Sequence, residues 1–288
     1  MRYIILILST ISLFSLNASA LPSQDVPPIS AEASERFTIS QYDIATAVDS
    51  YRIYLAIPKT AAPDKGYPAL YLLDANLQFP MTVNAYKPEN GPAPVIVGIG
   101  YKGDGVNFTP DRTRDYTVPA TGEDYKEGGK SPAFYHFIED QVKPLVAEKV
   151  KTDPKRQTLL GHSFGGLFTL HVIFNHPEAF TRYVAVSPAL WWGKGIVIPN
   201  DLSLPKAMPE KIIITVGSIE EIPDMSKLPD DPVARKRIEL RRQGPKIRDI
   251  AKKLQDGGWP VAFFSDPGKN HTTIIPDAID EALKLAVK

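Results

Sequence analysis

Short apolar runs recur along the chain and are separated by longer stretches of mixed polarity. Residues 51–57 alternate between apolar and polar, as a half-buried strand does. Residues 131–150 and 274–287 instead carry apolar side chains at helical spacing. Other runs are almost wholly apolar, which is typical of strands buried on both faces of a parallel sheet: 69–73, 95–100, 183–187 and 211–217. This alternation, which shows no internal repeat, predicts the α/β class with a doubly wound, mostly parallel sheet.

The amino terminus has a different pattern. Arg2 precedes an apolar run over residues 4–16, and Ala-Ser-Ala at 18–20 has the small residues of a signal-peptide cleavage site. The apolar run is shorter than the roughly 20 residues that a membrane-spanning helix needs. We therefore expect a signal peptide over 1–20, a flexible leader over 21–35 and a single α/β domain over 36–288. Such a chain is exported and has no stable membrane span after signal cleavage.

Composition narrows the possible functions. The sequence holds 33 basic and 33 acidic residues, a neutral balance that argues against a nucleic-acid partner. It contains no cysteine, which excludes disulfides, thiol catalysis and cysteine metal sites. For an exported protein, this absence is easiest to reconcile with the bacterial periplasm. Because there is neither a metal-ligand spacing nor a dinucleotide fingerprint after the first strand, we expect no metal and no cofactor.

The segment GHSFGG at 161–166 lies between a β-competent run at 156–160 and an apolar run long enough for a helix. A strand, a tight turn with a serine between glycines, and a helix form the nucleophile-elbow pattern G-x-S-x-G. Glycine suits the flanking positions because a Cβ beside such a sharp turn would clash. The turn leaves Ser163 at a helix N-terminus, where backbone N–H groups can stabilise an oxyanion. The alternative is an ordinary glycine-rich turn.

A serine hydroxyl needs an adjacent base to act as a nucleophile. The chain contains five histidines, and in the fold that carries this elbow the base follows the last strand. His136 lies on another expected helix, and His162 lies beside Ser163 on the sharp turn and points away from it. His171 and His176 lie further along the helix that follows Ser163. Only His271 follows the last expected strand, 261–264, so we predict that it is the base.

A carboxylate would hold the tautomer of this base. It should follow the strand at 211–217, which offers Glu220, Glu221 and, further on, Asp224. Asp266, at the end of the last strand, is a weaker candidate. We prefer Glu220, and the alternative is a serine–histidine dyad without a working acid.

The loop after the strand 69–73 should supply the second oxyanion-hole N–H, since this is its source in the same fold. The loop begins with Asp74, Ala75 and Asn76. We expect the backbone N–H of Ala75 or Asn76 to act together with that of Phe164. A capping turn in which Asp74 starts the next helix is the alternative.

Two further segments are candidates for binding substrate. Residues 101–130 have the composition of a long irregular loop, in which Arg112 and Arg114 lie near Tyr116. Their forked donors and the aromatic ring suit an anionic or catechol-like substrate, while an Arg–Asp pair that only pins the loop is the alternative.

The second segment carries Trp191 and Trp192, which follow the strand 183–187. Adjacent tryptophans at a strand end can form a stacking wall for an aromatic substrate. We expect at least one of them to line the pocket.

These motifs together resemble one known family. They are GHSFGGLF at 161–168, HPEAF at 176–180 and SPALWW at 187–192, with the segments at 71–76, 114–117, 216–220 and 270–271. Over nearly the whole mature chain they are similar to the putative-esterase family of α/β-hydrolases. That family includes enterochelin and salmochelin trilactone esterases, S-formylglutathione hydrolases and feruloyl esterases. Ala75 departs from the glycine that the family commonly has at this position.

Within the family, the chain most resembles the siderophore-esterase branch, some members of which are exported. The resemblance implies the α/β-hydrolase fold and hydrolysis of a catecholate-trilactone type of ester, with Ser163 as nucleophile and His271 as base. Some exported members lack the third acid, so the resemblance leaves the role of Glu220 open. The rival hypotheses are a general carboxylesterase, feruloyl-type esterase or acyltransferase, and a non-catalytic binding protein on a hydrolase scaffold.

Overall fold

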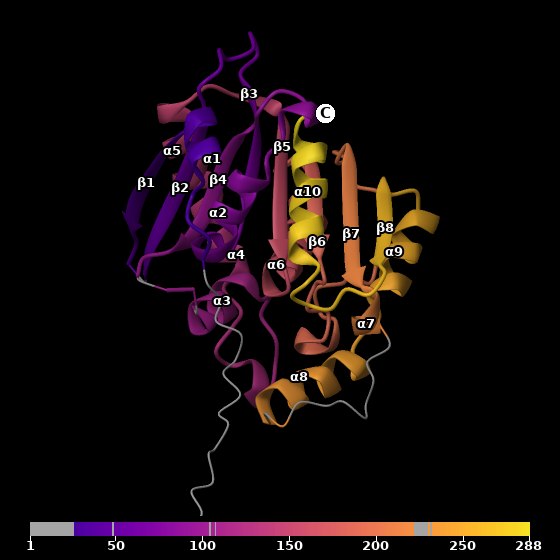
Figure 1. Cartoon of the computed structure of the whole chain (residues 1–288). Helices are drawn as coiled ribbons and strands as arrows, with labels where there is room; N and C mark the ends of the chain where they lie inside the picture. The colour runs from indigo at the N-terminus through magenta and orange to yellow at the C-terminus, as the bar shows by residue number, and fades with distance from the viewer. Residues whose placement is uncertain (1–25, 48, 104, 107, 222–229, 231) are drawn as a thin grey trace, which may run out of the picture.

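The computed structural model describes residues 26–47, 49–103, 105–106, 108–221, 230 and 232–288; the expected signal peptide over 1–20 lies outside them. These residues form an eight-stranded sheet with the order β1-β2-β4-β3-β5-β6-β7-β8 (Figure 1). The strands are β1 (Phe37–Ala45), β2 (Ser50–Pro58), β3 (Tyr67–Leu72), β4 (Val95–Tyr101), β5 (Thr152–His162), β6 (Arg182–Val186), β7 (Lys211–Gly217) and β8 (Val261–Asp266). Only the β1–β2 and β2–β4 pairs are antiparallel.

Helices cover both faces of this sheet, and each face has its own apolar core. On one face lie α1 (Ala31–Arg36), α2 (Ala75–Ala85) and α10 (Ile275–Ala286). On the other lie α4 (Ser131–Phe137), α5 (Lys143–Lys149), α6 (Phe164–Asn175) and α9 (Ile247–Asp256). Successive residues of β3 point into alternate cores, Leu70 into one and Tyr71 into the other, which explains the unbroken apolar run. The doubly wound, mostly parallel sheet predicted from the sequence is therefore confirmed.

The remaining helices gather at the edge of the sheet where the parallel strands end (Figure 1). They are α3 (Thr109–Tyr116), α7 (Ser218–Glu221) and α8 (Pro232–Gln243). In sheets of this kind, ligands bind outside the carboxyl ends of the strands. The turns that leave β3, β5, β6, β7 and β8 meet at this edge, which makes it the place to look for a site.

Two expectations about local structure are wrong. Residues 101–130 are not an irregular loop, since they contain α3, whose polar composition conceals it, and the short helix η2 (Glu123–Tyr125). Residues 31–35, expected in the leader, form most of α1, because the Ser30 hydroxyl caps the helix and Ala33 is buried. Residues 131–150, expected to be helical, form α4 and α5 with the π-helical stretch η3 (Ile138–Val142) between them. Across the described ranges, none of the helices has the length and apolar character needed to cross a membrane.

Candidate active site

The turn between β5 and α6 has the strained backbone of a nucleophile elbow. Ser163 has φ 60° and ψ −115°, a conformation that non-glycine residues rarely adopt. Hydrogen bonds hold it there: its N–H donates to the Val186 carbonyl at 2.9 Å, and its own carbonyl accepts from the Ala189 N–H at 3.1 Å. A Cβ on Gly161 would overlap the Gly165 carbonyl, and one on Gly166 would lie 2.8 Å from that of Val186. The glycines thus permit the close approach of β5, α6 and β6 that the motif predicts.

Three side chains from different strand ends form one hydrogen-bonded chain at this turn. His271 Nε2 lies 2.9 Å from Ser163 Oγ, and His271 Nδ1 lies 2.6 Å from Glu220 Oε2. A carboxylate only accepts, so Nδ1 carries the hydrogen and Nε2 is left to accept from the serine hydroxyl. The Glu220 side chain is 9% exposed and that of His271 24%. The acid is therefore shielded from water, while the imidazole stays accessible.

Glu220 and Glu221 bind different partners. The second oxygen of Glu220, Oε1, accepts from the Ser187 hydroxyl at 2.7 Å and from the Gly217 N–H at 3.2 Å. Glu221 instead faces Arg248 at 2.8 Å; burial raises the pKa of Glu221, but hydrogen bonds from Arg248 and Ser265 outweigh it and lower that pKa. Asp224 lies outside the described residues. Of Glu220 and Glu221, only Glu220 is bonded to His271.

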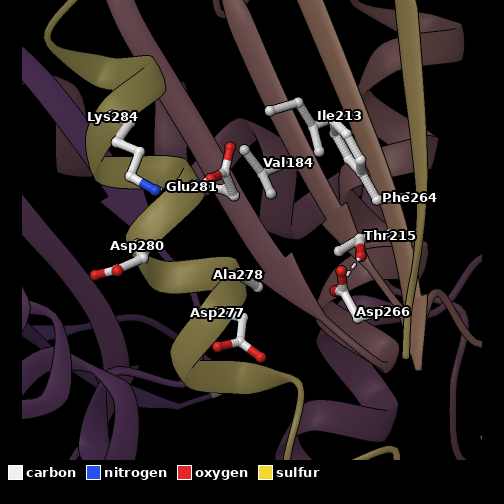
Figure 2. A pocket seen from close by; sticks show the side chains of 10 residues that line it. All are labelled: Val184, Ile213, Thr215, Phe264, Asp266, Asp277, Ala278, Asp280, Glu281 and Lys284. Carbon is white, nitrogen blue, oxygen red and sulfur yellow. Dashed lines mark hydrogen bonds and ion pairs between the residues drawn. The ribbon is translucent and has the colours of Figure 1, made fainter. Parts of the chain in front are cut away.

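Asp266, the weaker candidate for the acid, lines a cavity of about 280 Å³ between α10 and the strands β6 to β8 (Figure 2). Its Oδ2 accepts from the Thr215 hydroxyl at 2.8 Å, as the dashed line in Figure 2 shows. The cavity is lined by apolar side chains of the sheet and by the acids and Lys284 of α10, without a serine or histidine. It therefore lacks the serine and the histidine that the expected mechanism needs.

His162 contributes to the site in a way that the sequence did not indicate. Its Nε2 lies 2.8 Å from the backbone carbonyl of His271, and the two rings are 4.5 Å apart between centroids. Because a carbonyl only accepts, His162 Nε2 must carry a hydrogen and donate it. The ring is buried, and its hydrogen bond helps to hold the main chain of His271 in place. No local pattern signals this bond, since the two residues are 109 positions apart.

The loop that carries His271 is also held by its own turn. The Asn270 side-chain oxygen accepts from the N–H groups of Thr272 at 2.9 Å and Thr273 at 3.0 Å. A Cβ on Gly217 would overlap the carbonyl of Lys269, so glycine at the end of β7 lets this loop pass close by. The placement of His271 thus depends on β7 as well as on β8.

The candidate oxyanion donors lie at the starts of two helices. Ala75 and Phe164 are the first residues of α2 and α6, so their N–H groups have no acceptor within the helix. The two helix starts are close, since a Cβ on Gly165 would lie 3.6 Å from Asp74 Oδ2. Asp74 occupies the N-cap position of α2, as in the alternative for this turn, but its side chain makes no capping bond.

Ala75 and Asn76 are fixed by β4. The Cβ of Ala75 occupies space left by Gly98, where an added Cβ would lie only 2.7 Å away. The Asn76 side chain pairs with the backbone of Tyr101, accepting its N–H at 2.8 Å and donating to its carbonyl at 2.9 Å. The side chain of Asn76 is therefore structural, and only its backbone N–H remains a candidate donor.

The charged residues of α3 hold the structure together more than they face a ligand. Arg112 pairs with Asp74 at 2.9 Å, while Arg114 is enclosed by carboxylates and lies 2.7 Å from both oxygens of Asp115. Tyr116 is completely buried, and its hydroxyl accepts from the Asp74 N–H at 3.2 Å. The hypothesis of substrate contact is contradicted for Tyr116 by this burial and for Arg114 by its acid partners. Arg112 is partly exposed at the Asp74 turn and stays a candidate.

The two tryptophans have different surroundings. Trp192 is only 2% exposed, and its indole N–H donates to the Val118 carbonyl at 2.8 Å, so it belongs to the core and not to a binding wall. Trp191 lines a pocket of about 390 Å³ and packs against the Phe164 ring at 5.5 Å. One tryptophan therefore lines a pocket, as the sequence predicts, and the other does not.

Comparisons with known proteins place the chain in a family. Residues 45–221 match the family described as "Putative esterase". The ferri-bacillibactin esterase BesA of Bacillus subtilis is 31% identical, over 94% of this chain and 92% of that protein. Among solved structures, the BES protein from Bacillus cereus is similar with a TM-score of 0.72 and 26% identity, covering 87% of this chain and 95% of that chain. The siderophore hydrolase EstA from Aspergillus nidulans has the same TM-score and identity, covering 85% and 92%.

The match spans more than half of the sequence, and the similarity to BesA spans nearly all of it. The fold, with its mostly parallel sheet and helices on both faces, is shared with the solved structures. The chain is therefore an ester hydrolase and belongs to the putative-esterase family of α/β-hydrolases.

Proposed function

We propose that the protein hydrolyses carboxylic ester bonds of a siderophore-like substrate, of the catecholate-trilactone type, through an acyl-enzyme on Ser163. The observation that carries the mechanism is the hydrogen-bonded chain from Ser163 through His271 to Glu220. The substrate class is supported by the similarity to a ferri-bacillibactin esterase and to a siderophore hydrolase.

In this mechanism, Ser163 Oγ attacks the ester carbonyl while His271 Nε2 takes the hydroxyl proton. The Phe164 N–H and that of Ala75 or Asn76 stabilise the negative oxygen that forms. The C–O bond to the leaving alcohol then breaks, and His271 returns the proton to that oxygen. A water molecule repeats the sequence on the acyl-enzyme, giving the carboxylic acid and free Ser163. Glu220 holds the tautomer of His271 and stabilises its charged form.

Replacement of Ser163 tests the chemistry. We expect Ser163→Ala to lower kcat for a small aryl ester by at least about 10³-fold, as loss of a nucleophile does in such sites. Circular dichroism and the unfolding temperature should stay unchanged, because the substitution removes only one hydroxyl. Undiminished turnover by the folded variant would rule out the mechanism.

The substrate class needs a separate measurement. We expect a higher kcat/KM for a catecholate trilactone than for feruloyl or short-chain acyl esters, with water as the acceptor. A clear preference for a feruloyl or simple acyl ester, or transfer of the acyl group to an added alcohol in place of water, would reject this substrate class. Neither result would affect the assignment of Ser163.

Export forms part of the proposal and is supported by the charge, apolar run and small residues of positions 1–20. When the full chain is expressed in a Gram-negative host, we expect the periplasmic fraction to contain a protein whose first residue is near Leu21. An uncleaved chain that stays in the cytoplasm would contradict export.

A further inference from the structure

The pocket that Trp191 lines is a cavity of about 390 Å³ beside the carboxylate of Glu220. This volume lies within the range of small-molecule sites and is large enough for an aromatic ring. Its walls are mainly apolar and come from the turn after β6 and the turn between α8 and α9: Pro188, Leu190, Trp191, Pro245 and Ile247. The second turn packs tightly on the first, since a Cβ on Gly244 would lie 2.8 Å from Trp191 Cα.

Two paths of direct contact connect this pocket to Ser163. Trp191 forms one wall and packs against Phe164, the residue that follows the serine. Glu220 forms another and is bonded to His271, which is bonded to the serine hydroxyl. Along each path, a single side chain, Phe164 or His271, lies between a residue of the pocket wall and Ser163.

The two acids and the two cations that line the pocket differ in their partners. Its two acids already have partners, Glu220 with His271 and Glu221 with Arg248. Its two cations, Arg242 and Lys246, are exposed, and neither forms an ion pair or hydrogen bond through its side chain with any residue whose position is described. The pocket thus combines an aromatic wall with two exposed cations at its rim that have no acidic partner within the described part of the chain.

We propose that this pocket binds a planar aromatic group bearing negative charge, as one arm of the ester substrate. Trp191 provides the stacking surface, and Arg242 supplies paired N–H donors that suit a carboxylate or a catecholate. Lys246 adds a second, non-directional charge. The inference rests on the proposed function, because it places this arm next to the ester that Ser163 attacks.

Two aryl esters with a common leaving group provide the test, one with a 4-carboxylate on its acyl ring and one with the neutral, similarly shaped 4-carboxamide. The measured quantity is the ratio of kcat/KM for the anionic ester to that for the neutral ester. We expect the double variant Arg242→Gln with Lys246→Gln to lower this ratio by about tenfold or more, mainly through KM, and added salt to lower it in the wild type. Lys253→Gln removes an exposed charge from α9 outside the pocket and should leave the ratio within about twofold.

A binding measurement separates this inference from the proposed function. In the Ser163→Ala protein, benzoate should quench tryptophan fluorescence at lower concentration than benzamide, and the double variant should abolish this difference. A ratio of kcat/KM and a benzoate preference that are both unchanged in the double variant would overturn the pocket assignment. Full hydrolysis of both esters by Ser163→Ala would overturn the catalytic mechanism instead, whatever the double variant does.

Discussion

Glu220 receives three hydrogen-bond donors, from His271, Ser187 and the Gly217 main chain. Donors aimed at a carboxylate favour its charged form, which is the form that stabilises a protonated imidazole. Ser187 reaches this position with an unusual φ of 41°, at a site where it is almost fully buried. Such strain is maintained only where the surrounding contacts fix it, and here it places a hydroxyl against the acid.

The role of Glu220 can be tested by removing its charge. We expect Glu220→Gln to lower kcat by about 10²- to 10⁴-fold with little change in KM, because the amide no longer enforces the productive tautomer. Ser187→Ala should have a weaker effect in the same direction, about tenfold. Asp266→Asn serves as the control, since that acid lies in the other cavity. If Glu220→Gln kept kcat within about threefold, the site would work as a serine–histidine dyad.

His162 allows a test of how the base is positioned. His162→Leu removes the donor to the His271 carbonyl, and we expect kcat to fall about tenfold while KM stays within about twofold. In His162→Gln, the amide can donate to the same carbonyl, so this variant should keep most of the kcat that His162→Leu loses. The comparison uses steady-state kinetics together with the unfolding temperature. Equal losses in both variants would show that His162 acts only by filling space.

At this scale the sequence predicts the residues whose position follows from a strand end or a motif. Ser163 and His271 are of this kind, since the elbow and the last strand locate them. His162 and Ser187 are not, because each acts on an atom that is distant in sequence. Tyr116 is a candidate on its chemistry alone, and its burial follows from the packing of α3 against α4 and α6.

At the scale of elements, the site depends on turns that touch one another at the carboxyl edge of the sheet. The β8–α10 turn runs against the end of β7, where the Ile219 N–H donates to the Lys269 carbonyl at 3.1 Å and the Gly268 N–H donates to the Ser218 hydroxyl at 2.9 Å. Gly217 makes this approach possible. The acid and the base are therefore positioned as a pair.

Gly217→Ala should move His271 away from Glu220. The new Cβ meets the Lys269 carbonyl, which is backbone and cannot rotate away, so the turn that carries His271 must shift. We expect kcat to fall about 10- to 100-fold and the free energy of unfolding to drop by about 1–3 kcal/mol. Gly257→Ala, on the surface turn after α9, is the matched control and should change neither by much. Full activity in Gly217→Ala would show that the two turns are not coupled.

Strands were easier to predict than the helices at this edge. The strands are apolar on both faces, so their runs stand out, whereas α3 is polar and short and owes its position to tertiary contacts. The charged helices α8 and α9 follow each other closely in the sequence and are separated around Gly244 and Pro245. The turn between these helices forms one wall of the Trp191 pocket. The pattern of apolar residues in the sequence does not indicate this turn, and so it does not indicate the pocket.

At the scale of the whole molecule, stability depends on the two apolar cores and on the protonation state of the groups buried with them. One buried titratable group is His171, which lies on α6 beside the rings of Phe168 and His176. Burial, aided by the nearby His176, lowers the pKa of His171 from 6.5 to about 4. The folded protein thus resists protonation at a site that the unfolded chain protonates readily.

This difference predicts how stability varies with pH. Above pH 6.5 both states leave His171 neutral, so its full contribution is present; as the pH falls toward 4, the unfolded chain takes up the proton first and stability is lost. We expect the free energy of unfolding to fall by about 2 kcal/mol from this residue between pH 7.5 and 5. Urea titrations at both values should show a smaller fall in His171→Gln. An equal fall in the two proteins would mean that His171 is not responsible.

The central claim concerns Ser163, and a fluorophosphonate probe tests it most directly, because it reacts only with a serine that an adjacent base activates. The mature protein is treated with the probe, its intact mass is measured, and the modified peptide is sequenced. We predict a single adduct on Ser163 with parallel loss of esterase activity, absent from Ser163→Ala and strongly slowed in His271→Ala. A folded, active protein that gains no adduct, or gains it on another residue, would contradict the claim.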